Sequence, residues 1–280
     1  MKFRLNIYSQ ISSLVVIILP IFFFAIFSTM ITAQDKAPWL GKKCAVCLTY
    51  DDALITQLDN VVPLLDTLDL KATFYIPGYF PGFKEYMNEW KSVAEKGNEL
   101  GNHTLFHPCN GKPKGREFVK PDYDLNNYSV QRIVDEIKMD NILLSAIDGK
   151  NKRTFAYPCG DTKAGDSSYV NKIKSEFSGA RGVEGKLQKI NEIHLFDIGS
   201  YMIKELPGDS LISLVKQAMT GNDLLVFLFH GVGGGHNINV SLDAHNKLLH
   251  YLKQNEKDIW IAPMVDIAEY IKNYQRKNNN

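Results

Sequence analysis

The stretch Leu48-Thr49-Tyr50-Asp51-Asp52 decides the fold, because an apolar run that begins near Lys43 ends there in two adjacent carboxylates. A short apolar run that stops at charged residues is typical of a buried strand whose carboxyl end reaches a polar site. Two neighbouring carboxylates repel each other, so they need a metal ion or a shared proton to neutralise them. The stretch therefore predicts a buried strand that delivers charge to a functional site.

Two histidines four residues apart favour the metal ion. They lie in Gly101-Asn102-His103-Thr104-Leu105-Phe106-His107-Pro108, and one helical turn at this spacing would place both imidazoles on one side. Two His and one Asp make a three-ligand site with an open position, as in catalytic zinc sites. Each signal alone has a plainer explanation. Asp51-Asp52 would also suit a solvated strand end or a helix N-cap, and a lone His is commonly a hydrogen-bonded structural residue.

Strand-like and helix-like segments alternate along the rest of the chain, which predicts a parallel sheet covered by helices, either open or closed into a barrel. In such folds the chemistry gathers at the carboxyl ends of the strands. Asp51-Asp52, His103, Tyr157, Asp197 and His230 each follow an expected strand. The expected strands are 43–48, 72–76, a short one ending at 102, 153–157, 180–183, 194–198, 224–229 and 259–262; the expected helices are 55–65, 85–95, 130–145, 169–177, 211–219, 242–252 and 265–274.

The N-terminal 33 residues are expected to lie outside this fold. Lys2 and Arg4 precede an apolar run at 11–31, and Ala33 offers a small residue before a polar start. This pattern predicts an export signal cleaved after about Ala33, or an uncleaved membrane anchor in 11–31. Residues 34–280 are then one domain that works in the periplasm or outside the cell.

The charge balance gives no reason to expect a nucleic-acid partner. The chain has 32 basic and 31 acidic residues. Without Lys2 and Arg4 the basic residues number 30, which leaves a net charge of −1. Nucleic-acid binding is driven by clustered positive charge, and this composition does not supply it.

Four ordered motifs give the chain a resemblance to a known family, the polysaccharide deacetylases of carbohydrate esterase family 4. The resemblance runs from about Cys44 to Tyr270 and implies a distorted (β/α) barrel of about seven parallel strands. It also implies a divalent metal, usually zinc, and removal of acetyl groups from sugars. The motifs are Thr49-Tyr50-Asp51-Asp52-Ala53, His103-Thr104-Leu105-Phe106-His107-Pro108, Phe155-Ala156-Tyr157-Pro158-Cys159-Gly160 and Leu228-Phe229-His230-Gly231.

The resemblance assigns the metal site by position. Asp52, His103 and His107 would be the ligands. Asp51 would be the general base that deprotonates the metal-bound water, and Thr104 would hold His107 through a hydrogen bond. A metal lowers the pKa of bound water from about 15.7 to near 7, which makes hydroxide available at neutral pH.

The resemblance also assigns the groups around the substrate. His230 would be the general acid that protonates the leaving group. Leu228 would line a pocket for the acetyl methyl, and Tyr157 would contact the substrate. The backbone N–H of Cys159, which stands where the family usually has Tyr, would stabilise the oxyanion.

Three positions depart from the family pattern. The family often has an arginine that orients the base where this chain has Ala156, so Arg153 or Arg181 would have to take its place. The motif with an acidic residue and a Trp is faint here, and Asp197 is the expected partner of His230. Ala53 stands where the family usually has Gly, which would alter the turn slightly.

The four cysteines fall into two pairs. Cys44 and Cys47 are three residues apart in an expected strand, so they would face opposite sides and serve as core residues. Cys109 and Cys159 each follow an expected active-site motif, and in an exported protein they could pair as a disulfide that braces the site. Two buried free thiols are the equal alternative.

The sequence thus predicts a metal-dependent deacetylase of an acetylated poly- or oligosaccharide, such as an N-acetylglucosamine polymer, peptidoglycan or acetylxylan. One alternative is a catalytically inactive carbohydrate-binding protein on the same fold. Another is an amide hydrolase of the allantoinase type, acting on small cyclic ureides. The loop 109–127, with Phe118, Tyr123 and Tyr128, would form a sugar-stacking rim or a plain surface loop.

Overall fold

The structure is a computed structural model that describes residues 38–278. Pro38–Gly41 is a short 3₁₀ turn, η1, described by itself; the fold below is that of residues 42–278. Across the described residues, no helix combines the length and apolar character that crossing a bilayer requires. The expected export signal or anchor in 1–33 lies outside the described residues.

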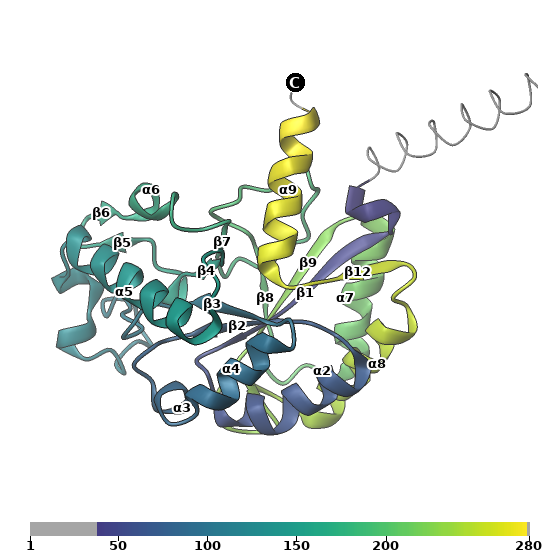
Figure 1. The fold of residues 1–280 in the computed structure, drawn as a ribbon, viewed down its shortest axis with the longest axis horizontal. Helices are drawn as coiled ribbons and strands as arrows, with labels where there is room; N and C mark the ends of the chain where they lie inside the picture. The colour runs from purple at the N-terminus through teal and green to yellow at the C-terminus, as the bar shows by residue number, and fades with distance from the viewer. Residues whose placement is uncertain (1–37, 279–280) are drawn as a thin grey trace, which may run out of the picture. The chain divides into compact units, whose positions relative to one another are not determined.

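One parallel sheet of eight strands forms the centre of the molecule, with β1 in the middle (Figure 1). The strands run in the order β7-β4-β3-β2-β1-β9-β8, and β12 also pairs with β1. β9 follows one edge of β1, while β12 and β2 share the other, pairing with its first and last three residues respectively. The strands are β1 (Cys44–Asp51), β2 (Thr73–Ile76), β3 (Glu99–Asn102), β4 (Phe155–Ala156), β7 (Ala180–Arg181), β8 (Tyr201–Met202), β9 (Leu224–Phe229) and β12 (Ile259–Ile261).

The sheet curls toward closure between its outer strands β7 and β8. A parallel bridge joins Arg181 to Ile198, and the Ser200 N–H donates to the Glu184 carbonyl at 2.9 Å. These bonds tie the end of β7 to the segment that leads into β8. The expected fold class, a distorted (β/α) barrel of parallel strands, is confirmed.

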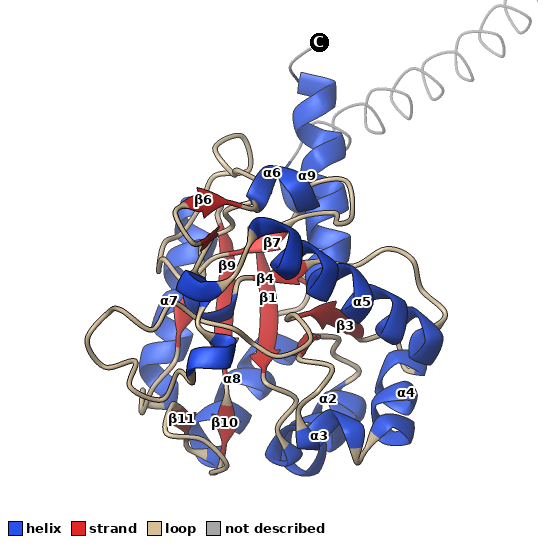
Figure 2. Cartoon of the chain, turned by 90° about the vertical axis from the view of Figure 1, so that its left-hand side faces the viewer, coloured by secondary structure: helices blue, strands red, loops and turns tan. Residues whose placement is uncertain are grey.

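Helices cover the outside of the sheet (Figures 1 and 2). Some expected segments are shorter than their patterns suggested. The helix expected at 169–177 spans four residues, and the strand expected at 194–198 is a turn in which the Asp197 N–H donates to the His194 carbonyl. The helices are η2 (Gln57–Val61, a π-helix), α2 (Val62–Leu68), α3 (Pro81–Lys84), α4 (Met87–Glu95), η3 (Pro121–Tyr123), η4 (Leu125–Asn127), α5 (Val130–Asp148), η5 (Pro158–Gly160), α6 (Val170–Ile173), α7 (Gly208–Gly221), α8 (Leu242–Gln254) and α9 (Met264–Asn278); two small two-stranded sheets pair β5 (Lys163–Ala164) with β6 (Ser167–Ser168) and β10 (Gly231–Val232) with β11 (Asn239–Val240).

The alternation of side chains along β1 separates the apolar core from the polar interior of the barrel. Every second residue from Cys44 to Tyr50 belongs to the main apolar core. The alternate, odd-numbered residues of the strand include Thr49, whose hydroxyl donates to the Phe227 carbonyl at 2.7 Å, and Asp51 at the strand end. Because successive side chains of a strand point to opposite faces, the register that buries Tyr50 in the core sends Asp51 to the other side.

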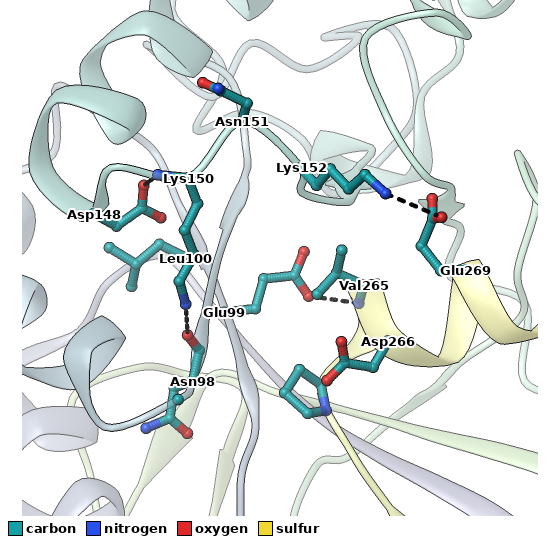
Figure 3. Close-up of a pocket in the computed structure, with 12 residues that line it drawn as sticks. Asn98, Glu99, Leu100, Asp148, Lys150, Asn151, Lys152, Val265, Asp266 and Glu269 are labelled. Atoms are coloured by element: carbon teal, nitrogen blue, oxygen red, sulfur yellow. Dashed lines mark hydrogen bonds and ion pairs between the residues drawn. The ribbon is translucent and has the colours of Figure 1, made fainter.

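A buried carboxylate braces the amino ends of the strands. Glu99, the first residue of β3, accepts hydrogen bonds from the Thr73 hydroxyl, from the Thr154 N–H and hydroxyl, and from the Val265 N–H in the first turn of α9. It lines a pocket of about 550 Å³ (Figure 3). Burial raises the pKa of Glu99 against the lowering effect of these donors. Because both of its oxygens are engaged, Glu99 holds α9 against the barrel.

A buried Tyr–His pair in the core makes stability depend on pH. The Tyr50 hydroxyl lies 2.7 Å from His245 Nε2, and both side chains are fully buried. Burial lowers the pKa of His245 from 6.5 to about 4. Between these values the unfolded chain takes up a proton that the folded chain does not, so stability falls as pH drops below 6.5.

We expect this single histidine to remove about 2 kcal/mol of unfolding free energy between pH 7.5 and pH 5.0. Urea unfolding at the two pH values measures the difference. His245→Gln keeps an acceptor for Tyr50 and cannot titrate, so the variant should lose correspondingly less stability over the same interval. An equal loss in both proteins would show that His245 is not the responsible group.

Candidate active site

A left-handed turn at the end of β1 brings both carboxylates to the same site. Neighbouring residues of a regular strand point to opposite faces, but Asp52 has φ 77° and Ala53 has φ 51°. Left-handed backbone is costly for residues other than Gly and is held only by its surroundings. Gly82 packs directly against this turn, since a Cβ there would lie 2.0 Å from the Ala53 carbonyl oxygen. Ala53 therefore keeps the left-handed conformation for which a glycine would be the usual residue.

The two candidate histidine ligands lie on a loop rather than on a helical turn. Thr104 and His107 have φ of 66° and 54°, so the expected helical turn is wrong. The loop still brings the two imidazoles together, with ring centroids 4.7 Å apart. The Thr104 hydroxyl accepts a hydrogen bond from the His107 N–H at 2.8 Å, which confirms the expected support of His107 by Thr104.

Asp52, His103 and His107 form a set that fits a divalent cation. Asp52 Oδ1 lies 3.6 Å from His107 Nε2 and 3.9 Å from His103 Nε2. Donors at about 2.0–2.2 Å from a tetrahedral zinc ion lie about 3.3–3.6 Å apart, which is close to these separations. Asp52 Oδ1 is buried and has no hydrogen-bond partner among the described residues. A cation between the three side chains would satisfy that oxygen.

The backbone of β4 orients His103 toward this set. His103 Nδ1 donates to the Ala156 carbonyl at 2.8 Å, which leaves the Nε2 lone pair free to bind a metal. Burial lowers the pKa of His103 from 6.5 to about 4, and the neighbouring carboxylates only partly oppose this effect. The ring is therefore neutral at physiological pH, as a metal ligand must be.

Arg181 holds the second carboxylate, Asp51. Its Nη2 lies 2.7 Å and 2.5 Å from the two Asp51 carboxylate oxygens, and both side chains are buried. Burial by itself would raise the pKa of Asp51, but the Arg181 charge, followed by His103 and His230, lowers it overall. Of the two candidate substitutes for the arginine missing at Ala156, Arg181 is the one that contacts Asp51. Arg153 instead binds Asp148 and the Leu100 carbonyl.

His230 follows β9 and faces the same site. Its Nε2 lies 4.0 Å from Asp52 Oδ2, and the preceding Leu228 is buried in β9. Gln57 ties the two strand ends together, because its amide donates to the carbonyls of Asp51 at 2.6 Å and His230 at 3.1 Å. Burial lowers the pKa of His230 against the opposing effect of the carboxylates.

The expected pairing of Asp197 with His230 is wrong. Asp197 is exposed in the turn that replaces the expected strand. His230 Nδ1 is buried without a hydrogen-bond partner among the described residues. The ring that packs on His230 belongs to His236, with centroids 4.8 Å apart and planes 12° apart. The pairing was predicted from a strand at 194–198, and without that strand the Asp197 side chain points to solvent.

The turn after β4 places Cys159 but buries Tyr157. Cys159 has φ 55° within η5. Tyr157 is 2% exposed, and its hydroxyl donates to the Phe196 carbonyl at 3.0 Å. The expected contact between the Tyr157 side chain and substrate is therefore not available. Its ring packs beneath the turn, against Phe155 and Tyr169.

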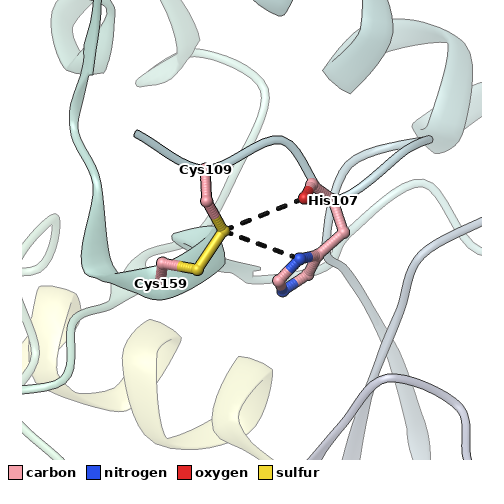
Figure 4. Close-up of side chains that lie close together, drawn as sticks. All are labelled: His107, Cys109 and Cys159. Atoms are coloured by element: carbon pink, nitrogen blue, oxygen red, sulfur yellow. Dashed lines mark hydrogen bonds between the residues drawn. A yellow bond between two sulfur atoms is a disulfide. The ribbon is translucent and has the colours of Figure 1, made fainter. Parts of the chain in front are cut away.

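A disulfide joins the loop of His107 to the turn of Cys159 (Figure 4). The Cys109–Cys159 bond confirms the bracing disulfide over the alternative of two free thiols. Cys109 Sγ lies 3.7 Å from His107 Nδ1, the ring nitrogen that is not directed at Asp52. Cys44 and Cys47 are free and buried, as expected of core residues.

Gln57 and His236 are the site residues that the sequence patterns did not single out for these roles. Gln57 lies within an ordinary helical pattern, so nothing in the sequence separates it from a surface residue. His236 stands in a glycine-rich segment in which no residue spacing marks it as part of a site. The role of Gln57 depends on a contact with His230, more than 170 residues away in the chain. The role of His236 depends on the backbone geometry that brings its ring onto His230.

The resemblance to the polysaccharide deacetylases is confirmed, because the model of that family matches residues 41–176. This match contains Asp51, Asp52, His103, His107 and Cys159. It ends before Arg181 and His230, whose placement comes from the fold.

Curated relatives are distant and much longer than the matched region. A gellan lyase from Bacillus sp. is 24% identical over 228 residues, which is 80% of this chain and 8% of that protein. The uncharacterized protein YlxY of Bacillus subtilis (strain 168) is 25% identical over 103 residues, 37% of this chain and 27% of its own length. The chain thus spans less than a third of either relative.

Solved structures share the fold at low sequence identity. A putative polysaccharide deacetylase from Mycobacterium smegmatis has a TM-score of 0.59 at 13% identity, covering 83% of this chain and 91% of its own. A mutant of the peptidoglycan deacetylase PdaC from Bacillus subtilis has a TM-score of 0.52 at 14% identity, covering 84% and 95%. A family 4 pseudoenzyme from Bacillus anthracis has a TM-score of 0.51 at 16% identity, covering 82% and 66%.

Replacing Arg181 should impair the base without emptying the metal site. Arg181→Gln removes the charge that lowers the pKa of Asp51, so we expect kcat to fall about ten- to a hundredfold. The acidic limb of the pH–rate profile should move to higher pH, because burial is then no longer opposed by the guanidinium. Arg181→Lys keeps a charge and is the matched control. An unmoved acidic limb in Arg181→Gln would contradict this role.

Reduction of the disulfide should loosen the candidate metal site. Opening Cys109–Cys159 frees the loop of His107, so we expect zinc affinity to fall about tenfold or more. Competition with a chromogenic chelator, before and after treatment with a phosphine reductant, measures the change. A Cys109→Ser/Cys159→Ser variant should show the weaker affinity at once and no response to reductant. Equal affinities in all forms would mean that the disulfide does not support His107.

Proposed function

We propose that this protein is a metal-dependent hydrolase that removes acetyl groups from an acetylated poly- or oligosaccharide. The observation that carries the proposal is the completeness of the site. Three metal-binding side chains, a carboxylate held by Arg181 and the imidazole of His230 all lie at the carboxyl ends of the strands. The match to the polysaccharide deacetylase family model supports the class of reaction.

Asp52, His103 and His107 would hold the metal, and zinc suits two imidazoles and one carboxylate, although other transition metals accept the same ligands. A bound divalent metal would polarise the acetyl carbonyl and make water more acidic. Asp51 is kept ionised by Arg181, so it can accept a proton from the attacking water.

His230 would complete the proton transfer on the other side of the substrate. Its lowered pKa makes its protonated form a ready donor to the leaving amine or alkoxide. The backbone N–H of Cys159 is the proposed oxyanion donor, and Leu228 the proposed floor for the acetyl methyl. The side-chain change from Tyr to Cys at position 159 leaves a backbone donor intact.

An inactive carbohydrate-binding protein is the second candidate, because a solved structure with this fold is described as a pseudoenzyme. The complete ligand set and the contact of Arg181 Nη2 with both Asp51 oxygens favour catalysis over binding alone. We also propose that residues 1–33 direct export, so that the enzyme meets its polysaccharide in the periplasm or outside the cell.

Acetate release tests the proposed reaction. Zinc-loaded protein should release acetate from at least one of acetylated xylan, chitooligosaccharides and peptidoglycan. Asp51→Asn should lower the rate about a hundredfold or more, and His103→Ala should also lose zinc. His194→Ala, an exposed histidine remote from the ligands, is the matched control.

Substrate turnover that survives in both variants would contradict the assigned roles. If zinc-loaded protein releases no acetate from any of these substrates, the result would favour an inactive carbohydrate-binding protein.

A further inference from the structure

A second pocket of about 420 Å³ opens beside the candidate metal ligand His107. Aromatic side chains dominate its lining: Tyr79, Phe80, Phe106, Phe118 and Tyr123. The imidazole of His107, which would hold the metal, lines the pocket. A sugar bound in the pocket would therefore neighbour the sugar that carries the reacting acetyl group. None of the residues assigned to the reaction lines it except His107.

The aromatic side chains of this pocket are held at the surface rather than buried. Phe118 is 65% exposed and Tyr79 is 53% exposed. Phe106 packs between Tyr79 and Tyr123, at centroid distances of 5.1 Å and 5.5 Å. A cluster of exposed aromatic rings around a hollow is typical of a binding surface, because flat rings stack on the apolar face of a sugar.

The loop 109–127, which supplies Phe118 and Tyr123 to the pocket, is held in place by covalent and hydrogen bonds. It is anchored at Cys109 by the disulfide, and Arg116 donates to the Cys159 carbonyl at 2.9 Å. Its two ends pair with each other, since the Cys109 N–H donates to the Tyr123 carbonyl and the Leu125 N–H to the Cys109 carbonyl. Long loops that are rigidly held usually serve a function, and a preformed surface loses little entropy on binding.

Two lysines give the pocket a charge preference. Lys84 Nζ lies 4.0 Å from the Tyr79 ring centroid, and Lys120 lines the same pocket together with Phe118 and Val119. No Asp or Glu is among the described residues that line this pocket. An anionic group is therefore the complementary partner, because a neutral sugar offers neither ammonium group an opposite charge.

We propose that this pocket binds the sugar next to the acetylated one, and that this neighbouring sugar carries a carboxylate. The inference rests on the proposed function and narrows its substrate class to acidic glycans. Phe118 and Tyr79 stack on the sugar ring, while Lys84 and Lys120 bind its carboxylate. The acetyl group then lies on the His107 side, within reach of the metal ligands.

Two pairs of oligosaccharides isolate the carboxylate. The first is N-acetylglucosaminyl-N-acetylmuramic acid and its methyl ester. The second is an acetylated xylo-oligosaccharide with a glucuronic acid branch and the methyl ester of that branch. Calorimetry on zinc-loaded Asp51→Asn protein measures affinity without turnover, and initial rates with the unsubstituted protein give KM and kcat separately.

We expect the free acid to bind about tenfold more tightly than its ester in one of the pairs, with the preference weakening as salt rises. Lys84→Gln/Lys120→Gln should abolish the preference, whereas Lys257→Gln, an exposed lysine outside the pocket, should keep it. Phe118→Ala should raise KM about tenfold with kcat little changed, and Ile142→Ala, equally exposed on α5, should not.

Equal affinity for acid and ester in both pairs would overturn the inference, as would a preference that survives the double lysine substitution. The two proposals fail separately. Binding that prefers the acid without any acetate release supports the pocket and removes the catalytic proposal. Acetate release with no preference for the acid supports catalysis and removes the pocket.

Discussion

Asp51 and Asp52 are adjacent and buried, and two carboxylates this close together need different partners. A single cation between them would leave one carboxylate poorly paired in a low-dielectric environment. The left-handed turn after β1 brings both carboxylates to one site but gives them different partners. Asp51 stays in the line of β1 and meets Arg181, while Asp52 turns toward His107. His103 Nε2 lies near both carboxylates, 3.7 Å from Asp51 Oδ2 and 3.9 Å from Asp52 Oδ1.

The alternation within β1 connects this electrostatic arrangement to the stability of the whole barrel. Tyr50 stacks between Phe74 and Phe229 on the helix-covered side, at centroid distances of 5.1 Å and 5.3 Å. A shift of register by one residue would place Tyr50 in the polar interior and Asp51 among apolar side chains. The apolar core therefore fixes the direction of Asp51, and the cost of misplacing either residue enforces the register.

Much of this arrangement could be predicted from the sequence because it depends on local pattern. The buried strand at β1 and the parallel alternation follow from apolar runs, and the grouping of Asp52, His103 and His107 follows from their positions in the family motifs. Contacts between distant segments could not be predicted in the same way. Arg181 was one of two candidates until the short strand β7 placed it, and Asp197 was misassigned because Leu195 and Phe196 imitate a strand where the chain turns.

The guanidinium that serves Asp51 arises from β7, whereas the family pattern places an arginine on the strand that here ends in Ala156. These two strands are direct neighbours in the sheet, paired from Phe155 to Ala180 and from Ala156 to Arg181. Arg181, on the strand next to β4, therefore reaches the carboxylate that an arginine at position 156 would be expected to contact. A search for polysaccharide deacetylases that requires the motif arginine would overlook a chain with this arrangement. The informative criterion is a cation in contact with the first carboxylate of the Asp-Asp pair, whichever strand supplies it.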